Sequence, residues 1–398
     1  MPRVMGRFWE IFLVAGRLGL TSFGGPIAHI GYFREEYVVR RKWLDEGTFA
    51  ELIALCQFLP GPASSQLGMA VGIKRGGLLG GFAAWLGFTL PSALALILFA
   101  YGVQELGAQE SADWLHGLKI VAVAVVALAL WGMGRTLTPD RTRITIAVVA
   151  AGALLLSGSI AAQLVVIAGG AVLGLIVLKP PEPRTDGDVV SNGGTRSAAV
   201  LLIAFLVLLA VLPLASRLTE NLAVDVVDSF YRTGSLVFGG GHVVLPLIEA
   251  EVVPPGWVTS DEFLAGYGAA QAVPGPLFTF SAYLGASVNG LTPAWGGGLL
   301  ALAAIFAPSF LLVPGVLPFW ERLRGVARVR QALMGVNAAV VGLLLAALYD
   351  PLWTSAIETP ADFAVAAAAF ALLAFWKAPP WLVVVVTAIA GAAVVQLL

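Results

Sequence analysis

A stretch that reads QFLPGPASS at residues 57–65 occurs a second time, as QAVPGPLFT, at residues 271–279. In both copies Pro-Gly-Pro interrupts a run of mostly apolar residues. Proline lacks a backbone N–H and glycine adopts backbone conformations that other residues avoid, so an α-helix does not continue through this tripeptide. The sequence therefore predicts two helices that are broken within apolar regions.

The similarity between the two copies extends over most of the chain. The matching positions are Arg17 with Arg232, Gly19 with Gly234, Phe23 with Phe238, Gly24 with Gly239, Gly25 with Gly240, Glu36 with Glu251, Trp43 with Trp257, Phe49 with Phe263, Gln57 with Gln271, and Pro91-Ser92 with Pro308-Ser309. Matches in one order indicate an internal repeat. We expect an N-terminal membrane repeat at 1–178, a polar cytoplasmic linker at 179–197 and a C-terminal repeat at 198–398.

Composition places both repeats in a membrane. Of the 398 residues, 59% are hydrophobic and 12% are charged, whereas a soluble domain carries about 25% charged residues. Apolar runs such as 78–103 and 198–213 are 26 and 16 residues long, on either side of the ~20 residues that a helix needs to cross the hydrocarbon core. The pattern lacks the alternation of a β-barrel wall. The sequence therefore predicts an all-α polytopic integral membrane protein.

Lysine and arginine are enriched in cytoplasmic loops of membrane proteins. Three consecutive basic groups precede the first long apolar run, namely Arg3 with Arg7, residues 34–42, and Lys74-Arg75. All three lie inside only if the segments between them return to the same face. We therefore expect re-entrant hairpins that turn at 24–26 and at 60–62. The alternative, thirteen full crossings, places 34–42 outside and violates the charge bias.

The corresponding hairpins of the second half are predicted to enter from the opposite side. They turn near 239–241 and at 274–276, and their flanking loop, 249–262, is acidic and free of lysine and arginine. An extra span at 198–216 supplies the inversion. We therefore expect nine full crossings and four hairpins, with two homologous halves in inverted topology with re-entrant or broken helices. Transporters commonly have this architecture and bind substrate near the membrane midplane.

Each half offers a similar set of candidate substrate-binding residues. The first set is Arg17, Ser22, Gly24, Gly25, Gln57, Gly61, Ser64 and Ser65, and the second is Arg232, Gly239, Gly240, Gln271, Gly275 and Thr279. A helix that restarts after Pro-Gly-Pro presents unpaired N–H groups and a partial positive charge, which attract anions. Arginine is costly at membrane depth, and its planar guanidinium binds two oxyanion oxygens. We expect Arg17 and Arg232 to neutralise a dianion at a central site.

Structural roles are alternative explanations for the same residues. Pro-Gly-Pro also serves as a kink for helix packing, and the glycine pairs also permit close helix contact. Arg17 and Arg232 also fit snorkelling or pairing with Glu10 and Asp228. The candidates for proton coupling are His29, Glu36, His242 and Glu251. Packing histidines and loop-facing surface acids are the alternatives for these four.

Several function classes lack the residues that they require. Cys56 is the one cysteine, and the three histidines are scattered through the chain. No G-x-S-x-G, H-E-x-x-H or P-loop pattern occurs. The net charge of −1 does not suggest nucleic-acid binding. We therefore expect no enzyme activity, no metal and no cofactor; the expected partners are a small oxyanion and the lipid bilayer, with a homodimer as one possible assembly.

The repeated residues resemble the chromate ion transporter (CHR) family in its long, two-domain form. The residues that carry the resemblance are Ser22 to Pro26 with His29, Phe58 to Pro62, Gly76-Gly77 to Gly81, Phe238 to His242, and Val273 to Pro276. The resemblance covers nearly the whole chain apart from the central linker. It implies export of chromate, a sulfate-like dianion, across the bacterial inner membrane, driven by the proton-motive force and conferring chromate resistance.

Electrostatics are compatible with export. A membrane potential of about 100 mV contributes ~2.3 kcal/mol per elementary charge, so an inside-negative potential favours the exit of a dianion. A secondary active transporter is therefore the first hypothesis. A carrier for sulfate or another oxyanion and a passive anion channel remain the alternatives.

Overall fold

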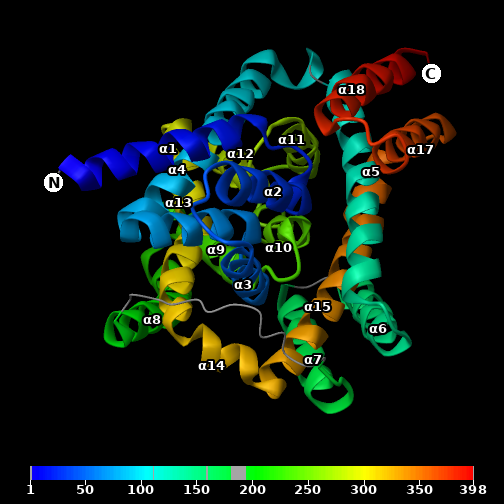
Figure 1. Ribbon diagram of the computed structural model, residues 1–398. Coiled ribbons are helices and arrows are strands. Elements are labelled where there is room, and N and C mark those ends of the chain that lie inside the picture. The colour runs from blue at the N-terminus through cyan, green and yellow to red at the C-terminus, as the bar shows by residue number, and fades with distance from the viewer. Residues whose placement is uncertain (1, 111, 158–159, 181–193, 398) are drawn as a thin grey trace.

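The computed structural model describes residues 2–110, 112–157, 160–180 and 194–397. Every regular element in these residues is a helix (Figure 1), and five of the helices are long and apolar enough to cross a membrane. The prediction of an all-α membrane protein is confirmed. Most of the expected linker at 179–197 lies outside the described residues.

The first half begins with helices that end at the predicted breaks. The elements are α1 (Pro2–Thr21), α2 (Gly25–Phe33), the π-helix η1 (Arg34–Arg40), α3 (Glu46–Phe58) and α4 (Ala63–Glu110). Gly24, between α1 and α2, has a φ of 94°, which glycine adopts readily. The Asp45 carboxylate caps α3 by accepting a hydrogen bond from the Thr48 backbone N–H. Pro60-Gly61-Pro62 then separates α3 from α4.

Helix α4 folds back on itself at Gly77, whose φ is 66°. A Cβ atom added to Gly72 would lie 2.3 Å from the Gly80 carbonyl oxygen. A continuous helix would place these two residues about 12 Å apart along its axis. The segments before and after Gly77 therefore pack against each other as a tight hairpin, and only the second of them extends as a long span.

The second half repeats this order of elements. It contains α9 (Leu222–Leu236), the 3-10 helix η2 (Gly241–Val243), α10 (Val244–Val252), α11 (Ser260–Ala272), the 3-10 helix η3 (Leu277–Thr279), α12 (Phe280–Ser287) and α13 (Ala294–Val316). A Cβ on Gly285 would lie 2.3 Å from the Gly297 carbonyl oxygen. Helices α12 and α13 thus form the same close glycine-to-glycine crossing as the two segments of α4.

Long helices follow each set of hairpins. The first set is α5 (Ala112–Leu137), α6 (Arg141–Ser157) and α7 (Ile160–Val177), and α8 (Thr195–Thr219) leads into the second half. The second set is η4 (Leu317–Phe319), α14 (Trp320–Gly325), α15 (Ala327–Ala347), η5 (Leu348–Trp353), α16 (Thr354–Ala356), α17 (Pro360–Ala374) and α18 (Pro380–Leu397).

The two halves exchange these long helices. Helix α5 packs against α17 and α18 of the second half, and α15 packs against α6 and α7 of the first half. Glycines permit the close approach: a Cβ on Gly391 would lie 2.4 Å from the Gly117 Cα, and a Cβ on Gly335 would lie 2.8 Å from the Gly174 Cα. Small residues are typical of tightly packed membrane helices. Neither half forms its bundle alone.

The basic groups of the first half meet at one place. Arg75 Nη2 lies 3.0 Å from Glu10 Oε1, and Arg41 Nη1 lies 3.8 Å from the same oxygen. The Arg75 guanidinium also stacks over the Trp43 ring at 4.3 Å. The end of the first segment of α4, the loop before α3 and the N-terminal part of α1 therefore lie together. This arrangement agrees with two re-entrant hairpins that return to one face.

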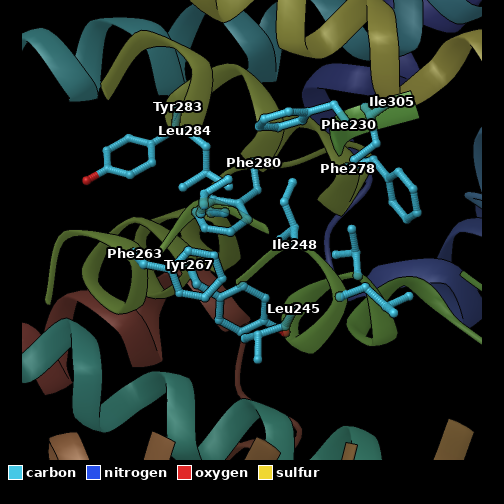
Figure 2. Close-up of a cluster of buried hydrophobic side chains, with 14 of the residues drawn as sticks. Phe230, Leu245, Ile248, Phe263, Tyr267, Phe278, Phe280, Tyr283, Leu284 and Ile305 are labelled. Carbon is cyan, nitrogen blue, oxygen red and sulfur yellow. The ribbon is translucent and has the colours of Figure 1, made fainter. Parts of the chain in front are cut away.

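The hairpins of the two halves are packed differently. Helix α11 packs against α5 and α18, and a Cβ on Gly268 would lie 2.2 Å from the Leu118 carbonyl oxygen. Figure 2 shows the rings of Phe263, Tyr267 and Phe280 in the core that surrounds this helix. In the first half, α3 packs mainly against α4 and η1 of its own repeat. Ala54, the counterpart of Gly268, is exposed.

Candidate functional site

The broken helices of the two halves are joined by exchanged backbone hydrogen bonds. The Gly61 N–H donates to the Val237 carbonyl at 2.7 Å, and the Gly275 N–H donates to the Ser22 carbonyl at 2.9 Å. Each Pro-Gly-Pro is thus bound to the glycine-rich loop of the opposite repeat. The pair of bonds has the same two-fold relation as the sequence repeat.

The repeated Pro-Ser pairs also cross between halves. Gln66 Nε2 donates to the Pro60 carbonyl at 2.6 Å and lies 3.1 Å from Ser309 Oγ. A Cβ on Gly275 would lie 2.9 Å from Ser92 Oγ. Ser92 and Ser309 are absent from the predicted site, although their repeated position in the sequence was a usable signal. Gln66 gave no such signal because Phe280 stands at the matching position.

Four helix beginnings meet at these crossings. They are the first residues of α2, of η2 with α10, of α4 and of η3 with α12. Besides the exchanged bonds, a Cβ on Gly25 would lie 3.8 Å from His242 Nε2, which places the start of α2 beside η2. The unpaired N–H groups and positive dipole ends of such helices favour a bound anion.

Several buried donors at the centre have no hydrogen-bond partner among the described residues. They are Ser22 Oγ, Ser65 Oγ and Gln271 Nε2. Unpartnered buried polar atoms are rare in native proteins. The three groups are therefore available to a polar ligand. Of the other predicted residues, Thr279 Oγ donates to the Pro276 carbonyl at 2.7 Å, Ser64 is buried, Gln57 is exposed, and Gly239 and Gly240 are partly buried.

The two histidines of the hairpins occupy different surroundings. His242 Nδ1 lies 2.7 Å from the Tyr267 hydroxyl, and its Nε2 faces Gly25. The ring of His29 is buried, packs edge-on against Phe88 at 5.3 Å, and lies against the backbone of Ser22. His242 is thus placed to contact a ligand at the centre. The Tyr267 bond, which fixes its ring, was not predicted.

Arg232 is held by two carboxylates. Its Nη2 lies 2.9 Å from Asp228 Oδ2 and 2.8 Å from Glu251 Oε2. Glu251 also accepts a hydrogen bond from Ser229 Oγ at 2.9 Å. The pairing with Asp228 is the structural alternative that the sequence offered. Arg232 lines a small cavity of about 10 Å³ and keeps its Nε without a partner among the described residues.

Arg17 and Glu36 do not share the surroundings of their counterparts. The Arg17 side chain is exposed on α1, and Glu10, its expected partner, is bound by Arg75 and Arg41. Glu36 accepts hydrogen bonds from Arg41 at 2.6 Å and Arg40 at 3.2 Å. Although burial disfavours its charge, these bonds hold the pKa of Glu36 below its ordinary value. The structure therefore does not bring the two repeated arginines into equivalent positions.

Metal ligands are not gathered at the centre. No group of three or more histidine, cysteine or acidic residues that could hold a metal ion occurs in the described residues. Cys56 is buried on α3. Among the described residues, the centre has backbone N–H groups, hydroxyls, the amides of Gln66 and Gln271 and the His242 imidazole, a set that suits an oxyanion better than a cation.

Known proteins share both the repeat and the whole length of the chain. The family model described as "Chromate transporter" matches twice, at residues 9–175 and 224–392. A chromate transport protein of Pseudomonas aeruginosa is 31% identical over 97% of this chain and 90% of the relative. A probable chromate transport protein of Synechococcus elongatus is 27% identical over 94% of this chain and 92% of the relative. No solved structure matches the chain.

Proposed function

The chain belongs to the chromate transporter family, and we propose that it is a secondary active transporter that exports chromate from the cytoplasm of a bacterium across its inner membrane. The observation that carries the proposal is the junction of the four broken helices. The exchanged bonds of Gly61 and Gly275 hold the helix beginnings together at the interface of the two halves, where inverted-repeat transporters bind substrate.

The proposed binding site uses neutral donors more than arginine. Backbone N–H groups at the start of α2 and α4, the hydroxyls of Ser22 and Ser65, and the His242 ring surround the same junction. Hydrogen bonds to a charged oxyanion are stronger than those between neutral groups. Arg232 supports the site through the second-half hairpin, since its charge is already shared with Asp228 and Glu251.

The unequal packing of the hairpins supports an alternating-access cycle. In this structure α11 packs closely against α5, whereas the matching face of α3 is exposed at Ala54. We propose that this arrangement is open to the cytoplasm. In the opposite state α3 packs against α15 and α11 leaves α5, so that the substrate faces the outside.

Energy coupling belongs to the same proposal. An inside-negative potential of about 100 mV favours the exit of a dianion by ~4.6 kcal/mol. His242 and Glu251 are the coupling candidates on the second-half hairpins, since His242 reaches the junction and Glu251 binds Arg232. Glu36 is a weaker candidate because two arginines hold its carboxylate.

Chromate uptake into everted membrane vesicles tests the proposal. We expect saturable uptake that an uncoupler abolishes and that vesicles without the protein lack. Non-saturable uptake that is indifferent to the uncoupler would favour the passive anion channel. Sulfate uptake without a preference for chromate would favour a general oxyanion carrier. The absence of flux for both anions, in vesicles that contain folded protein, would contradict the transport function.

A further inference from the structure

A second polar cavity lies at the face to which the first-half hairpins return. Its volume is about 440 Å³, and it is lined by Arg7, Lys42, Trp43, Leu44, Asp45, Thr48, Val71, Lys74 and Arg75. These residues come from α1, the loop before α3, α3 itself and the first segment of α4. The cavity is within the range of ordinary ligand pockets. It shares the first segment of α4 with the junction of the broken helices, but it lies at the other end of that segment, and none of the junction residues lines it.

The charge of this cavity is strongly positive. Arg7, Lys42 and Lys74 are exposed and make no ion pair among the described residues. Asp45 is the one acid in the lining, and its carboxylate already accepts hydrogen bonds from the Thr48 N–H and hydroxyl at 2.8 Å. Those bonds, with the backbone N–H as the larger cause, lower the pKa of Asp45. Its charge therefore stabilises α3.

Two features indicate that these basic residues do more than set the orientation of the chain in the membrane. Lys42 has a φ of 52°, a left-handed conformation that costs a side-chain-bearing residue ~1–2 kcal/mol. Gly256, its counterpart in the second half, has a φ of 75°, so glycine suffices for this turn. In addition, Arg75 Nε is buried and has no partner among the described residues, although both Nη2 contacts to Glu10 are formed.

The second half lacks the corresponding charges altogether. Leu222 matches Arg7, Gly256 matches Lys42, and the turn at 288–293 reads VNGLTP where the first half has Lys74 and Arg75. Trp257 retains the position of Trp43. The fold therefore forms this corner without basic residues, and only the first-half corner concentrates them around a cavity.

Exposed apolar side chains occur on the elements whose other residues line the cavity. Met5, Trp9 and Leu13 on α1 are 61%, 52% and 66% exposed, and Leu78 and Leu79 after the Gly77 turn are 63% and 58% exposed. In a membrane protein such side chains face lipid. Leu78 and Leu79 follow Lys74 and Arg75 of the cavity closely in the chain, so we expect the cavity to lie at the depth of the lipid headgroups. Basic pockets between helices on the cytoplasmic side suit the headgroups of anionic phospholipids.

We propose that this cavity binds the phosphodiester headgroup of an anionic phospholipid, with Arg7, Lys42, Lys74 and the free Nε of Arg75 as donors. The acyl chains extend over Leu78-Leu79. The bound lipid contacts the start of α1, the loop before α3 and the α4 turn, and so stabilises the ends of the first-half hairpins that meet at this cavity. A free inorganic phosphate would satisfy the same donors, and the test separates these two sources.

Thermal unfolding of the purified full-length protein in detergent tests the proposal. Cardiolipin, phosphatidylglycerol, phosphatidylcholine and inorganic phosphate are titrated separately into the wild type and two double variants. K42Q/K74Q removes two cavity lysines, and R322Q/R328Q removes two exposed arginines, one on α14 and one in the first turn of α15. Both doubles remove two charges, and neither touches the junction of the broken helices.

We expect cardiolipin to raise the Tm of the wild type and phosphatidylcholine to leave it unchanged. At about fivefold in affinity per basic residue near a headgroup, K42Q/K74Q should need roughly 25-fold more cardiolipin for half of the stabilisation. R322Q/R328Q should remain within about twofold of the wild type. Equal behaviour of the two doubles would overturn the site in favour of general charge attraction. Stabilisation by inorganic phosphate equal to that by cardiolipin would overturn the lipid in favour of a free anion.

Discussion

The two sets of hairpins share a sequence pattern but not a packing state. On α2, Tyr32 is 42% exposed, whereas Leu247, its counterpart on α10, is 5% exposed. Ala54 on α3 is exposed, whereas Gly268 on α11 packs against the backbone of α5. The same motif is thus closely packed in the second half, the sealed arrangement, and left exposed in the first half, the unsealed arrangement. A transporter built from inverted repeats needs this property, because exchanging the two arrangements moves the access from one side to the other.

A leucine at the closely packed position, Gly268, should have the largest effect on folding. A leucine at the matching exposed position, Ala54, is the control. G268L forces a side chain where even a Cβ would lie 2.2 Å from the Leu118 carbonyl oxygen, so we expect a loss of folding stability of several kcal/mol and little monodisperse protein by size-exclusion chromatography. A54L should fold normally because position 54 is exposed.

The same pair of variants also tests the proposed movement of α3 in a transport assay. If α3 packs against α15 in the opposite state, A54L obstructs that packing and lowers chromate uptake at unchanged expression. A folded, fully active A54L would contradict the proposed movement of α3, and a well-folded G268L would contradict the sealed arrangement of α11.

The repeated arginines provide the next comparison. R232Q leaves Asp228 and Glu251 buried without their cation, which should destabilise the protein by about 3 kcal/mol and remove transport. R17Q changes an exposed side chain and should alter stability by less than about 0.5 kcal/mol. Thermal unfolding measures both, with wild-type protein as the reference. Loss of chromate uptake in a stable R17Q variant would show that Arg17 contacts substrate, whereas an unchanged Tm in R232Q would contradict the buried ion-pair network.

Replacing each of the two histidines by phenylalanine distinguishes a role in ligand binding from a role in packing. H242F removes the ring nitrogen that faces Gly25 and the bond to Tyr267, so we expect chromate uptake to fall by at least about tenfold, the loss of one hydrogen bond to a charged ligand. H29F replaces a buried ring that packs against Phe88 and the Ser22 backbone by another aromatic ring, and uptake should stay closer to that of the wild type than in H242F. Equal losses in the two variants would argue against a special role for His242.

The smallest effect is expected at the ion pair that closes the first-half hairpins. Glu10 and Arg75 are both about one-third exposed, so solvent screens their attraction and E10Q should cost less than about 1 kcal/mol. The matched variant E46Q removes the exposed partner of Arg34 and should change the Tm less. A Tm loss in E10Q several times larger would indicate that this pair contributes more to the hairpins than its exposure suggests.

Much of this architecture follows from local sequence. Glycine and proline mark the breaks at Gly24 and Pro60-Gly61-Pro62, and the positions of Lys74 and Arg75 predict that the hairpins return to one face. The exchange of long helices between halves was not predictable in this way. Gly117 and Gly391 stand in apolar helices where any face can be the packed one, and only the tertiary structure brings them together.

The candidate site was predictable in its backbone and less so in its side chains. Repetition identified the Pro-Gly-Pro loops, because such breaks have few other uses at membrane depth. It did not reveal that Arg17 faces outward or that Glu251 joins Asp228 at Arg232. Leu13 stands at the position that matches Asp228, so Arg17 lacks the corresponding carboxylate. The Tyr267 partner of His242 and the Gln66 bond to Ser309 join residues that no repeat links.

Side-specific thiol labelling tests most directly whether the two sets of hairpins face opposite sides. In a C56A background, E46C and D261C place single thiols at the starts of α3 and α11, where both native side chains are exposed. With a membrane-impermeant maleimide, we predict that E46C reacts in everted vesicles only and D261C in right-side-out vesicles only. Reaction of both thiols from the same side would contradict the inverted arrangement on which the transport mechanism depends.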